Sequence, residues 1–234
     1  MSGVEVDAGT IVVFSDVGCP WAGLAVHRLR RRRAELGLDG TVVLDHRAFP
    51  LELFNEQVTP KTIVDSEVAV VGSHEPALGW KPWDRAERAY PNTTLLALEA
   101  VQAAKASEVG GLAGSERLDA ALRRAWFVES RSINLYAEIL AVARSCPGVD
   151  ADALDAALRM GAGREAVFAQ FDAAHAAEVQ GSPHLFLADG WNAHNPGITL
   201  SWTGGQFEGM PVIVDDDPSV YDDILRRAAG PDRA

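Results

Sequence analysis

The pattern of apolar and polar residues predicts β-strands near the start of the chain. Residues 10–14 (TIVVF) are apolar and rich in β-branched side chains, which is typical of a buried strand. Residues 41–49 form a second candidate strand. Between them a helix is expected from near Pro20 to Gly37, because proline is tolerated in a first turn and glycine often ends a helix. These segments predict a βαβ unit with two parallel strands.

The middle of the chain has a different pattern. Residues 51–91 hold scattered prolines and tryptophans without clear periodicity, so we expect irregular structure there. From residue 92 to about 180 the sequence is rich in alanine, and apolar residues recur at spacings of three and four, which predicts several helices. We expect breaks between these helices at Gly110-Gly111, Ser132, Pro147-Gly148 and Gly161.

The last part of the chain returns to a strand pattern. Residues 184–189, 198–202 and 211–215 are the candidate strands. A final helix is expected to begin within residues 215–218 (DDDP), because aspartate favours the N-cap and proline the first helical position. The predicted order is therefore βαβ, then helices, then strands and a closing helix.

Charge and hydropathy exclude some functions. The formal net charge is −12, which would repel a phosphate backbone, so we expect no nucleic-acid partner. The opening residues MSGVEVDAGT contain no basic region and no long apolar run, and no stretch approaches the ~18–20 apolar residues of a membrane span. We therefore expect a cytoplasmic protein without membrane association. The sequence leaves open whether it is a monomer or a homodimer.

The two cysteines are too few for a disulfide framework. Neither has a second cysteine or a histidine at metal-binding spacing, and the histidines lack such spacing among themselves, so no metal site is expected. Cys146 lies beside Pro147 at a predicted helix end, and we interpret it as non-catalytic.

Cys19 is the candidate reactive group, because it lies where a strand ends and a helix begins. Unpaired backbone N–H groups and the positive end of the helix dipole favour a thiolate at such a position. We therefore expect a lowered pKa for the Cys19 thiol. The alternative is a buried and inert cysteine, which is common for free cysteines.

Four segments resemble one family. Residues 14–23 (FSDVGCPWAG) resemble the active-site loop of the DsbA-like thioredoxin-fold oxidoreductases, in particular the FrnE-like branch with its S-D-x-x-C-P-W-C signature. Residues 90–100, 123–133 and 179–187 resemble further motifs of that family, in the same order. The branch is related to 2-hydroxychromene-2-carboxylate isomerases and kappa-class glutathione transferases. The resemblance spans roughly residues 10–228.

The resemblance implies an α/β fold of thioredoxin type with an all-helical insertion. Residues 9–55 and 162–230 would form the discontinuous thioredoxin-like domain, and residues 56–161 the insertion. It also implies a cis peptide bond before Pro183, in a loop that faces Cys19. The backbone of Ser182 would then bind an extended substrate or a thiol cofactor.

The sequence departs from the family motif at one position. The active-site motif here is Cys19-Pro20-Trp21-Ala22, whereas redox members of the family have a second cysteine where Ala22 stands. That second thiol attacks the mixed disulfide and releases the partner, which alanine cannot do. Ala22 is either natural or an engineered replacement.

Three functions stay open. The first is a DsbA-like thiol-disulfide oxidoreductase that acts through a single cysteine on a protein or small-molecule disulfide. The second is a transferase, reductase or isomerase that uses a small thiol, glutathione or mycothiol, on a hydrophobic substrate. The third is a non-catalytic thioredoxin-fold binding protein. No tightly bound cofactor is expected.

Aromatic residues are candidates for a substrate pocket or for the core. Trp21 lies in the active-site motif itself. Trp80, Trp83, Trp126 and Phe127 lie in the predicted insertion, which covers the cysteine in the family. Large aromatics are most often core residues, and an apolar pocket is the alternative interpretation.

Overall fold

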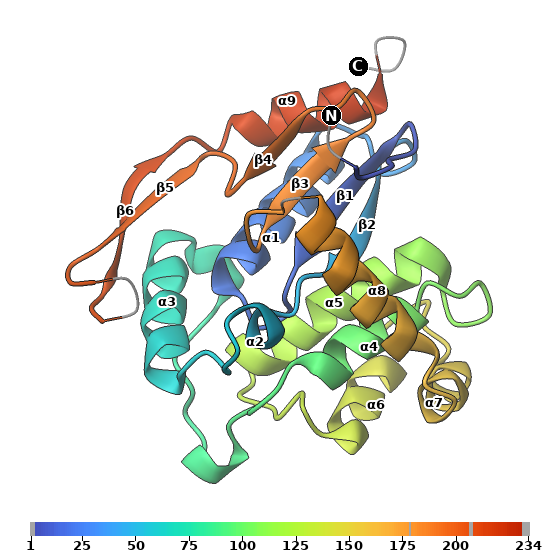
Figure 1. The fold of residues 1–234 in the computed structure, drawn as a ribbon, viewed down its shortest axis with the longest axis horizontal. Coiled ribbons are helices and arrows are strands. Elements are labelled where there is room, and N and C mark those ends of the chain that lie inside the picture. The colour runs from blue at the N-terminus through green and yellow to red at the C-terminus, as the bar shows by residue number, and fades with distance from the viewer. Residues whose placement is uncertain (1–2, 178, 206–207, 231–234) are drawn as a thin grey trace.

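The computed structural model describes residues 3–177, 179–205 and 208–230. Its centre is a four-stranded sheet with the order β2-β1-β3-β4 (Figure 1). The strands are β1 (Thr10–Ser15), β2 (Val43–Ala48), β3 (His184–Leu187) and β4 (Asn192–His194). β1 and β2 are parallel, and helix α1 (Pro20–Glu35) connects them, so the predicted βαβ unit is confirmed. β3 pairs antiparallel with both β1 and β4.

Both faces of this sheet are covered by helices, because β1 is apolar on both sides. Ile11 and Val13 point to the face where α1 and α9 (Val220–Ala229) pack. Val12 and Phe14 point to the opposite face, where α8 (Ala162–Ala176) contributes Ala174. The chain therefore has the mixed α/β, three-layer arrangement that a thioredoxin-type fold requires.

The remaining helices come between β2 and α8 in the sequence. In Figure 1 most of them gather below the sheet. They are α2 (Leu51–Phe54), α3 (Lys61–His74), α4 (Leu95–Ala103), α5 (Gly111–Phe127), α6 (Tyr136–Arg144) and α7 (Ala151–Arg159), with short 3₁₀ turns at Pro76–Leu78 and Glu87–Ala89. The helices predicted after residue 92 are confirmed, and α5 and α8 begin beside the predicted breaks at Gly110 and Gly161. The domain limits at residues 56 and 161 stay a prediction.

The expectation of irregular structure over residues 51–91 is wrong for part of that range. α3 forms there, and its buried residues Val64, Val68 and Val71 recur at spacings of four and three. This is helical periodicity, which the neighbouring prolines and tryptophans obscured in the sequence.

The three candidate strands of the C-terminal part are confirmed, but their arrangement and the start of the last helix differ from the expectation. Strands β5 (Ile198–Trp202) and β6 (Pro211–Asp216) form a separate hairpin, while β4 was not predicted. The last helix begins after Ser219 rather than at the aspartate run. Asp217 instead accepts a hydrogen bond from the Ser219 backbone N–H at 3.0 Å, and Asp216 belongs to β6, where it pairs with Arg28. The aspartates therefore serve a turn and an ion pair before the helix starts.

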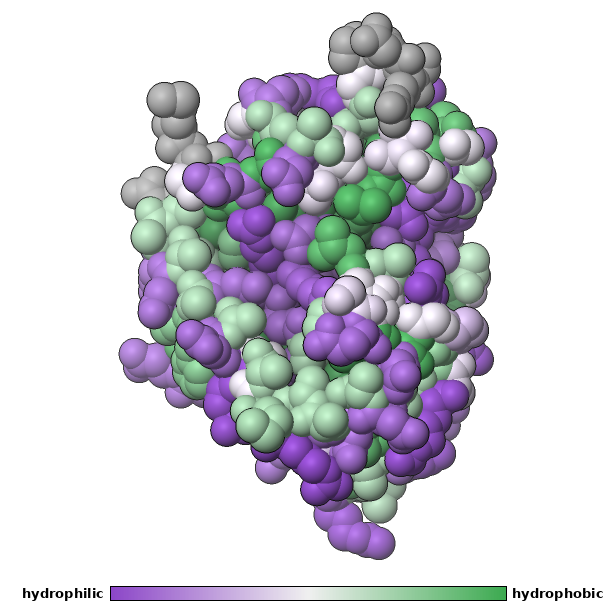
Figure 2. All heavy atoms as spheres, turned by 90° about the vertical axis from the view of Figure 1, so that its right-hand side faces the viewer, coloured by the Kyte–Doolittle hydropathy of each residue, from purple (hydrophilic) through white to green (hydrophobic). Residues whose placement is uncertain are grey.

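On the face drawn in Figure 2, hydrophilic and weakly apolar side chains are interspersed, and strongly hydrophobic ones form only small patches. Within the part of the chain that the structure describes, none of the helices has the length and hydropathy needed to cross a membrane.

Candidate active site

The loop between β1 and α1 places Cys19 at the start of the helix. Cys19 is the N-cap of α1, with extended backbone angles (φ −85°, ψ 115°), and Pro20 takes the first helical position. The Cys19 carbonyl accepts the helical hydrogen bond from the Gly23 backbone N–H at 3.1 Å. Asp16 closes the preceding turn, since its Oδ1 accepts from the Gly18 N–H at 2.8 Å. The sequence SDVGCP thus fixes the position of the thiol locally.

A second loop faces Cys19 from the start of β3. The peptide bond between Ser182 and Pro183 is cis, as the resemblance implies. The Cys19 Sγ donates a hydrogen bond to the Ser182 carbonyl oxygen at 3.1 Å. The Ser182 hydroxyl oxygen accepts from the Asp16 backbone N–H at 2.9 Å. Two long-range hydrogen bonds therefore join the active-site loop to the cis-proline loop.

These two loops border a cavity of about 390 Å³, which we call the Cys19 cavity. Its volume lies within the ~300–1,000 Å³ that is usual for small-molecule sites. The active-site loop, α1, α2, α3, the cis-proline loop, β4 and β5 all contribute to its wall. The lining residues are Gly18, Cys19, Trp21, Phe49, Leu51, Phe54, Asn55, Thr59, Val64, Glu67, Val179, Gln180, Gly181, Ser182, His194, Asn195, Leu200 and Trp202.

Glu67 brings a buried carboxyl group to this cavity from α3. Only 7% of the residue is exposed, and its Oε1 accepts a hydrogen bond from the Trp21 indole Nε1 at 2.9 Å. Burial raises the pKa of Glu67 to about 7, and the bond from Trp21 acts in the opposite direction. The carboxyl group therefore changes its charge near neutral pH.

The expectation of a lowered pKa for the Cys19 thiol is wrong in this structure. Burial, and next the Glu67 carboxylate, raise the pKa of Cys19 to about 11. Hydrogen bonds with the Ser182 side chain and the Ala22 backbone, and the charge of Arg123, act in the opposite direction but are outweighed. The residue is only 5% exposed, so it is largely withdrawn from bulk solvent although it lines the Cys19 cavity. At neutral pH Cys19 is a thiol that donates to Ser182.

The opposite side of the active-site loop is held by an arginine of α5. The Arg123 guanidinium is buried and donates to the Cys19 carbonyl oxygen at 3.1 Å and to Ser15 Oγ at 3.1 Å. It also pairs with Asp119, one helical turn earlier, at 2.8 Å. Burial by itself disfavours the Asp119 carboxylate, but the charge and the hydrogen bond of Arg123, together with the charges of His46 and Arg30, outweigh this and lower the pKa of Asp119. The ion pair therefore stays charged beneath the loop.

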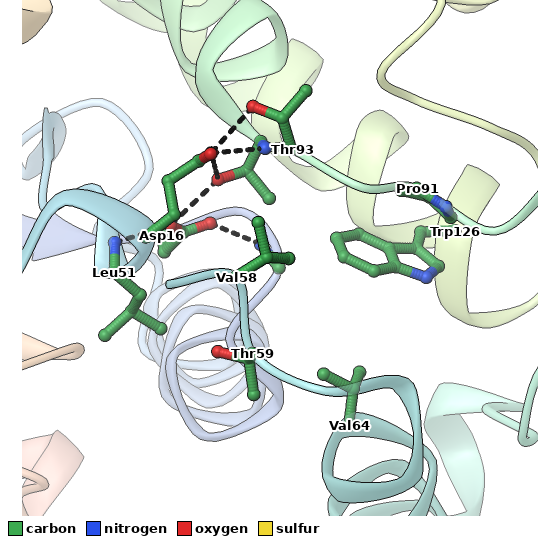
Figure 3. Close-up of a pocket in the computed structure, with 11 residues that line it drawn as sticks. Asp16, Leu51, Val58, Thr59, Val64, Pro91, Thr93 and Trp126 are labelled. Carbon is green, nitrogen blue, oxygen red and sulfur yellow. Dashed lines mark hydrogen bonds between the residues drawn. The ribbon is translucent and has the colours of Figure 1, made fainter. Parts of the chain in front are cut away.

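The Asp16 carboxylate ties three segments together beside a second, much smaller cavity (Figure 3). While Oδ1 accepts from Gly18, Oδ2 accepts from the Leu51 backbone N–H at 2.9 Å and from Thr94 Oγ1 at 2.9 Å. These partners come from the active-site loop, α2 and the N-cap of α4. Burial raises the pKa of Asp16, whereas these hydrogen bonds and the charge of Arg123 act in the opposite direction.

The four aromatics predicted in the insertion belong to the core, the favoured interpretation, and not to a pocket around Cys19. Trp80, Trp83, Trp126 and Phe127 are not among the described residues that line the Cys19 cavity. Trp126 stacks on Phe127 with ring centroids 5.3 Å apart, and Trp80 meets Phe127 at 4.6 Å. Trp83 contacts Tyr90 edge to face at 5.3 Å. They pack the insertion against the active-site loop, and Trp126 also lines the small cavity shown in Figure 3.

Aromatic residues from other parts of the chain line the Cys19 cavity instead. They are Trp21, Phe49, Phe54 and Trp202. Phe49 and Phe54 stack in parallel with centroids 3.9 Å apart, which gives the cavity one flat apolar wall.

The position of the missing second cysteine lies within the core. Ala22 has no exposed surface and packs in one cluster with Cys19 and Trp21. Cys146 is also free and buried, and it follows α6 within the predicted insertion. Burial raises the pKa of Cys146, while the charges of Arg117 and Arg30 act in the opposite direction. Among the described residues no cluster of three or more histidine, cysteine, aspartate or glutamate side chains could hold a metal ion.

Sequence reasoning did not identify Glu67, Arg123 or Asp16 as parts of the site. For Glu67 the signal was present, because the helical spacing of Val64 and Val68 places residue 67 beside a buried face. Asp16 and Arg123 lie inside quoted motifs, but only the folded chain shows that both contact the Cys19 loop.

Comparisons with known families and with solved structures both identify DsbA-like proteins as similar to this chain. A family model of the DSBA-like thioredoxin domain matches residues 10–206. A probable DsbA oxidoreductase from Streptomyces coelicolor has a similar structure, with a TM-score of 0.65 at 20% identity, covering 94% of this chain and 89% of that one. A comparison with curated proteins gives no match.

Two further solved structures share the fold. The cytosolic disulfide reductase DsbM from Pseudomonas aeruginosa has a TM-score of 0.60 at 16% identity, covering 92% of this chain and 96% of that one. A second structure of that reductase was solved with GSH. A 2-hydroxychromene-2-carboxylate isomerase has a TM-score of 0.55 at 16% identity, covering 78% of this chain and 88% of that one.

Proposed function

Because the chain belongs to the DSBA-like thioredoxin domain family, we propose that it performs thiol-disulfide exchange through Cys19 alone. The observation that carries this proposal is the position of the sulfur. Cys19 lines a cavity of about 390 Å³, and its sulfur lies 3.1 Å from the Ser182 carbonyl of the cis-proline loop, while alanine occupies residue 22.

The proposed reaction has two exchange steps. The Cys19 thiolate attacks one sulfur of a disulfide, so that a mixed disulfide forms and the other half leaves as a thiolate. An external thiol then attacks the substrate sulfur of the mixed disulfide, and Cys19 leaves as the thiolate. The external thiol ends in a new disulfide, so electrons and atoms balance. In this proposal the Ser182 backbone, whose carbonyl lies 3.1 Å from the Cys19 sulfur, binds the substrate backbone.

The resolving thiol in this proposal comes from outside the chain. Ala22 carries no sulfur, and Cys146 is buried after α6 in a different part of the fold. A small thiol, glutathione or mycothiol, suits the volume of the Cys19 cavity. The glutathione-bound structure of DsbM supports this partner class, and the cytosolic location of DsbM supports a cytoplasmic one here.

The high pKa of the Cys19 thiol favours the reducing direction. The reduced form of Cys19 lacks a stabilised thiolate, so formation of a disulfide at this sulfur does not have to overcome such a stabilisation. Strongly oxidising members of the thioredoxin fold depend on a stabilised thiolate instead. We therefore propose a monothiol reductase rather than an oxidant.

Intact-mass measurement tests the proposal directly. The protein is incubated with bis(2-hydroxyethyl) disulfide, and we expect one adduct, which disappears after addition of a free thiol. Cys19→Ser must abolish the adduct, whereas the matched variant Cys146→Ser must retain it. An adduct that depends on Cys146 would overturn the assignment. An unmodified Cys19 would favour a non-catalytic binding protein.

Restoring the second cysteine gives a sharper test. Residues 19 and 22 are three apart at a helix start, so Ala22→Cys places a thiol on the face that holds Cys19. The variant should form an internal disulfide and reduce insulin with a dithiol regenerant over many cycles. If the unmodified chain already matches this turnover, Ala22 does not limit the reaction.

One observation favours a second candidate function. The stacked rings of Phe49 and Phe54 give the Cys19 cavity an apolar wall, which suits a hydrophobic substrate of a small-thiol-dependent transferase or isomerase. Titration calorimetry measures the binding of a small thiol with and without an aromatic electrophile, and it distinguishes the monothiol reductase from this second candidate. Tight binding of both without any adduct on Cys19 would favour this second candidate.

A further inference from the structure

The Cys19 cavity has an unusual charge distribution for a site that would take a small biological thiol. Among the described residues that line it there is one carboxyl group, that of Glu67, and there is no lysine or arginine. Its one histidine, His194, has a pKa lowered by burial, which favours the neutral imidazole. The polar remainder of the wall consists of uncharged amides and hydroxyls, from Asn55, Thr59, Gln180, Ser182 and Asn195.

The Glu67 carboxyl group is fixed in this position. It comes from the middle of α3 and is held by the Trp21 indole N–H at 2.9 Å, and Trp21 lies two residues after Cys19. Its charge acts on the sulfur, since it is the second contribution, after burial, that disfavours the Cys19 thiolate. A negative group on an incoming disulfide would meet the same repulsion.

We propose that Glu67 makes Cys19 select disulfides and thiols that carry no negative charge near their sulfur. This selectivity rests on the proposed exchange reaction and names its substrate class. The amide oxygen of Asn195, which has no hydrogen-bond partner among the described residues, can accept from a ligand hydroxyl or amide. Of the two candidate thiols, glutathione carries two carboxylates and mycothiol none. The cavity therefore fits the uncharged, polyhydroxylated thiol.

The step that discriminates is the formation of the mixed disulfide. The Cys19 thiolate attacks a disulfide R–S–S–R, the S–S bond of the reagent breaks, and one RS⁻ leaves while Cys19–S–S–R forms. In this transition state the R group lies inside the cavity beside Glu67. Two unit charges about 8 Å apart change the rate by roughly three- to thirtyfold, depending on the local dielectric.

Three linear disulfides of similar length test the selectivity. Cystamine carries an ammonium on each half, bis(2-hydroxyethyl) disulfide a hydroxyl, and 3,3′-dithiodipropionate a carboxylate. Adduct formation at Cys19 is followed by intact mass in a Cys146→Ala background near pH 8.5, above the pKa of Glu67 of about 7. The two titratable groups on which Glu67 acts, Cys19 and Tyr90, are mostly uncharged at this pH, since burial raises the pKa of both. Each rate is divided by that of free 2-mercaptoethanol with the same reagent.

The expected order of normalised rates is cystamine, then the hydroxyl reagent, then the carboxylate reagent. In Glu67→Gln the ratio of the hydroxyl to the carboxylate reagent should fall by about three- to thirtyfold. This ratio cancels any general increase in thiolate, because every reagent meets the same sulfur. Glu87→Gln removes the same charge from an exposed position and should leave the ratio unchanged.

The outcomes separate the selectivity from the exchange reaction. An equal ratio in Glu67→Gln and the unmodified chain overturns the role of Glu67. If Glu67→Gln does not fold, equal normalised rates for all three reagents with the unmodified chain overturn the selectivity by themselves. If none of the three reagents modifies Cys19, the exchange reaction itself fails.

Discussion

The two sides of the active-site loop are built in opposite ways. On one side Cys19 lines a cavity of about 390 Å³, and Glu67 provides the one carboxyl group among the described residues of its wall. On the other side Arg123 donates to the loop carbonyls, and the small cavity beside Asp16 holds only about 30 Å³. A further cavity of about 220 Å³ borders Arg123, but Cys19 is not among its described lining residues. The open side offers the sulfur to a ligand, and the packed side holds the loop in place.

This difference explains what the helical insertion contributes. Its helices α4 and α5 supply the packed side through Thr94, Arg123 and Trp126. Its helix α3 supplies Glu67 to the open side. The insertion therefore both supports the loop and sets the electrostatic conditions at the thiol.

The largest effect is expected from the packed side. Arg123→Leu leaves the Asp119 carboxylate buried without its partner, and it removes the donors to the Cys19 and Ser15 oxygens. We expect a loss of about 3–5 kcal/mol in the free energy of unfolding, measured by urea denaturation. Arg124→Leu is the matched control, because the Arg124 side chain is 66% exposed and its loss should cost less than about 0.5 kcal/mol. Equal effects of the two variants would contradict the supporting role of Arg123.

The second prediction concerns the buried acid of the open side. The pKa of Glu67 is raised from 4.5 to about 7, so the folded chain binds this proton more tightly than the unfolded chain. Its contribution to stability is complete below about pH 4.5 and is lost as the pH rises through 7. Glu67→Gln should therefore be more stable than the unmodified chain by on the order of 3 kcal/mol near pH 8, and by only about 1 kcal/mol near pH 5.5.

Urea unfolding at both pH values measures this difference. Glu87→Gln, which removes an exposed carboxylate, should show no comparable change between them. A Glu67→Gln advantage that is the same at both pH values would mean that the carboxyl group is not desolvated.

The third prediction compares the Cys19 thiol with an ordinary one. With its pKa raised from 9.0 to about 11, Cys19 has roughly a hundredfold less thiolate at neutral pH than an unperturbed cysteine. Alkylation by iodoacetamide in a Cys146→Ala background should therefore keep accelerating beyond about pH 10. A plateau below about pH 8.5 would restore the low-pKa expectation drawn from the helix start.

The smallest effect is expected where the loop meets the insertion most closely. A Cβ atom at residue 18 would lie 2.6 Å from the Trp126 ring and 2.9 Å from Thr94 Cγ2. Because Trp126 is packed against Phe127 and Tyr90, it cannot withdraw freely, and Gly18→Ala should cost about 2 kcal/mol. We expect a decrease in Tm of about 4–8 °C by calorimetry. Gly40→Ala, with no atom within 4 Å of the added Cβ, should leave Tm unchanged.

The sequence alone determined the features that depend on local chemistry. The apolar run of β1, the CPW motif at a helix start and the ordered family motifs predicted the mixed α/β, thioredoxin-type fold. They also located Cys19 and the cis bond before Pro183. The absence of a cysteine at residue 22 is equally visible in the sequence. Strand periodicity and helix-start chemistry act over a few residues, so a single sequence contains them.

Only the tertiary structure decided the protonation of Cys19. The helix start favours a thiolate, but the thiol is covered by a loop 163 residues away and faces a carboxyl group from α3. Glu67 accepts a hydrogen bond from Trp21, which lies 46 residues away in the sequence, and no local pattern predicts that contact. The same holds for the pocket, whose aromatic wall comes from Phe49, Phe54 and Trp202 rather than from the insertion. Desolvation and long-range charge depend on which distant segments meet, and folding alone brings those segments together.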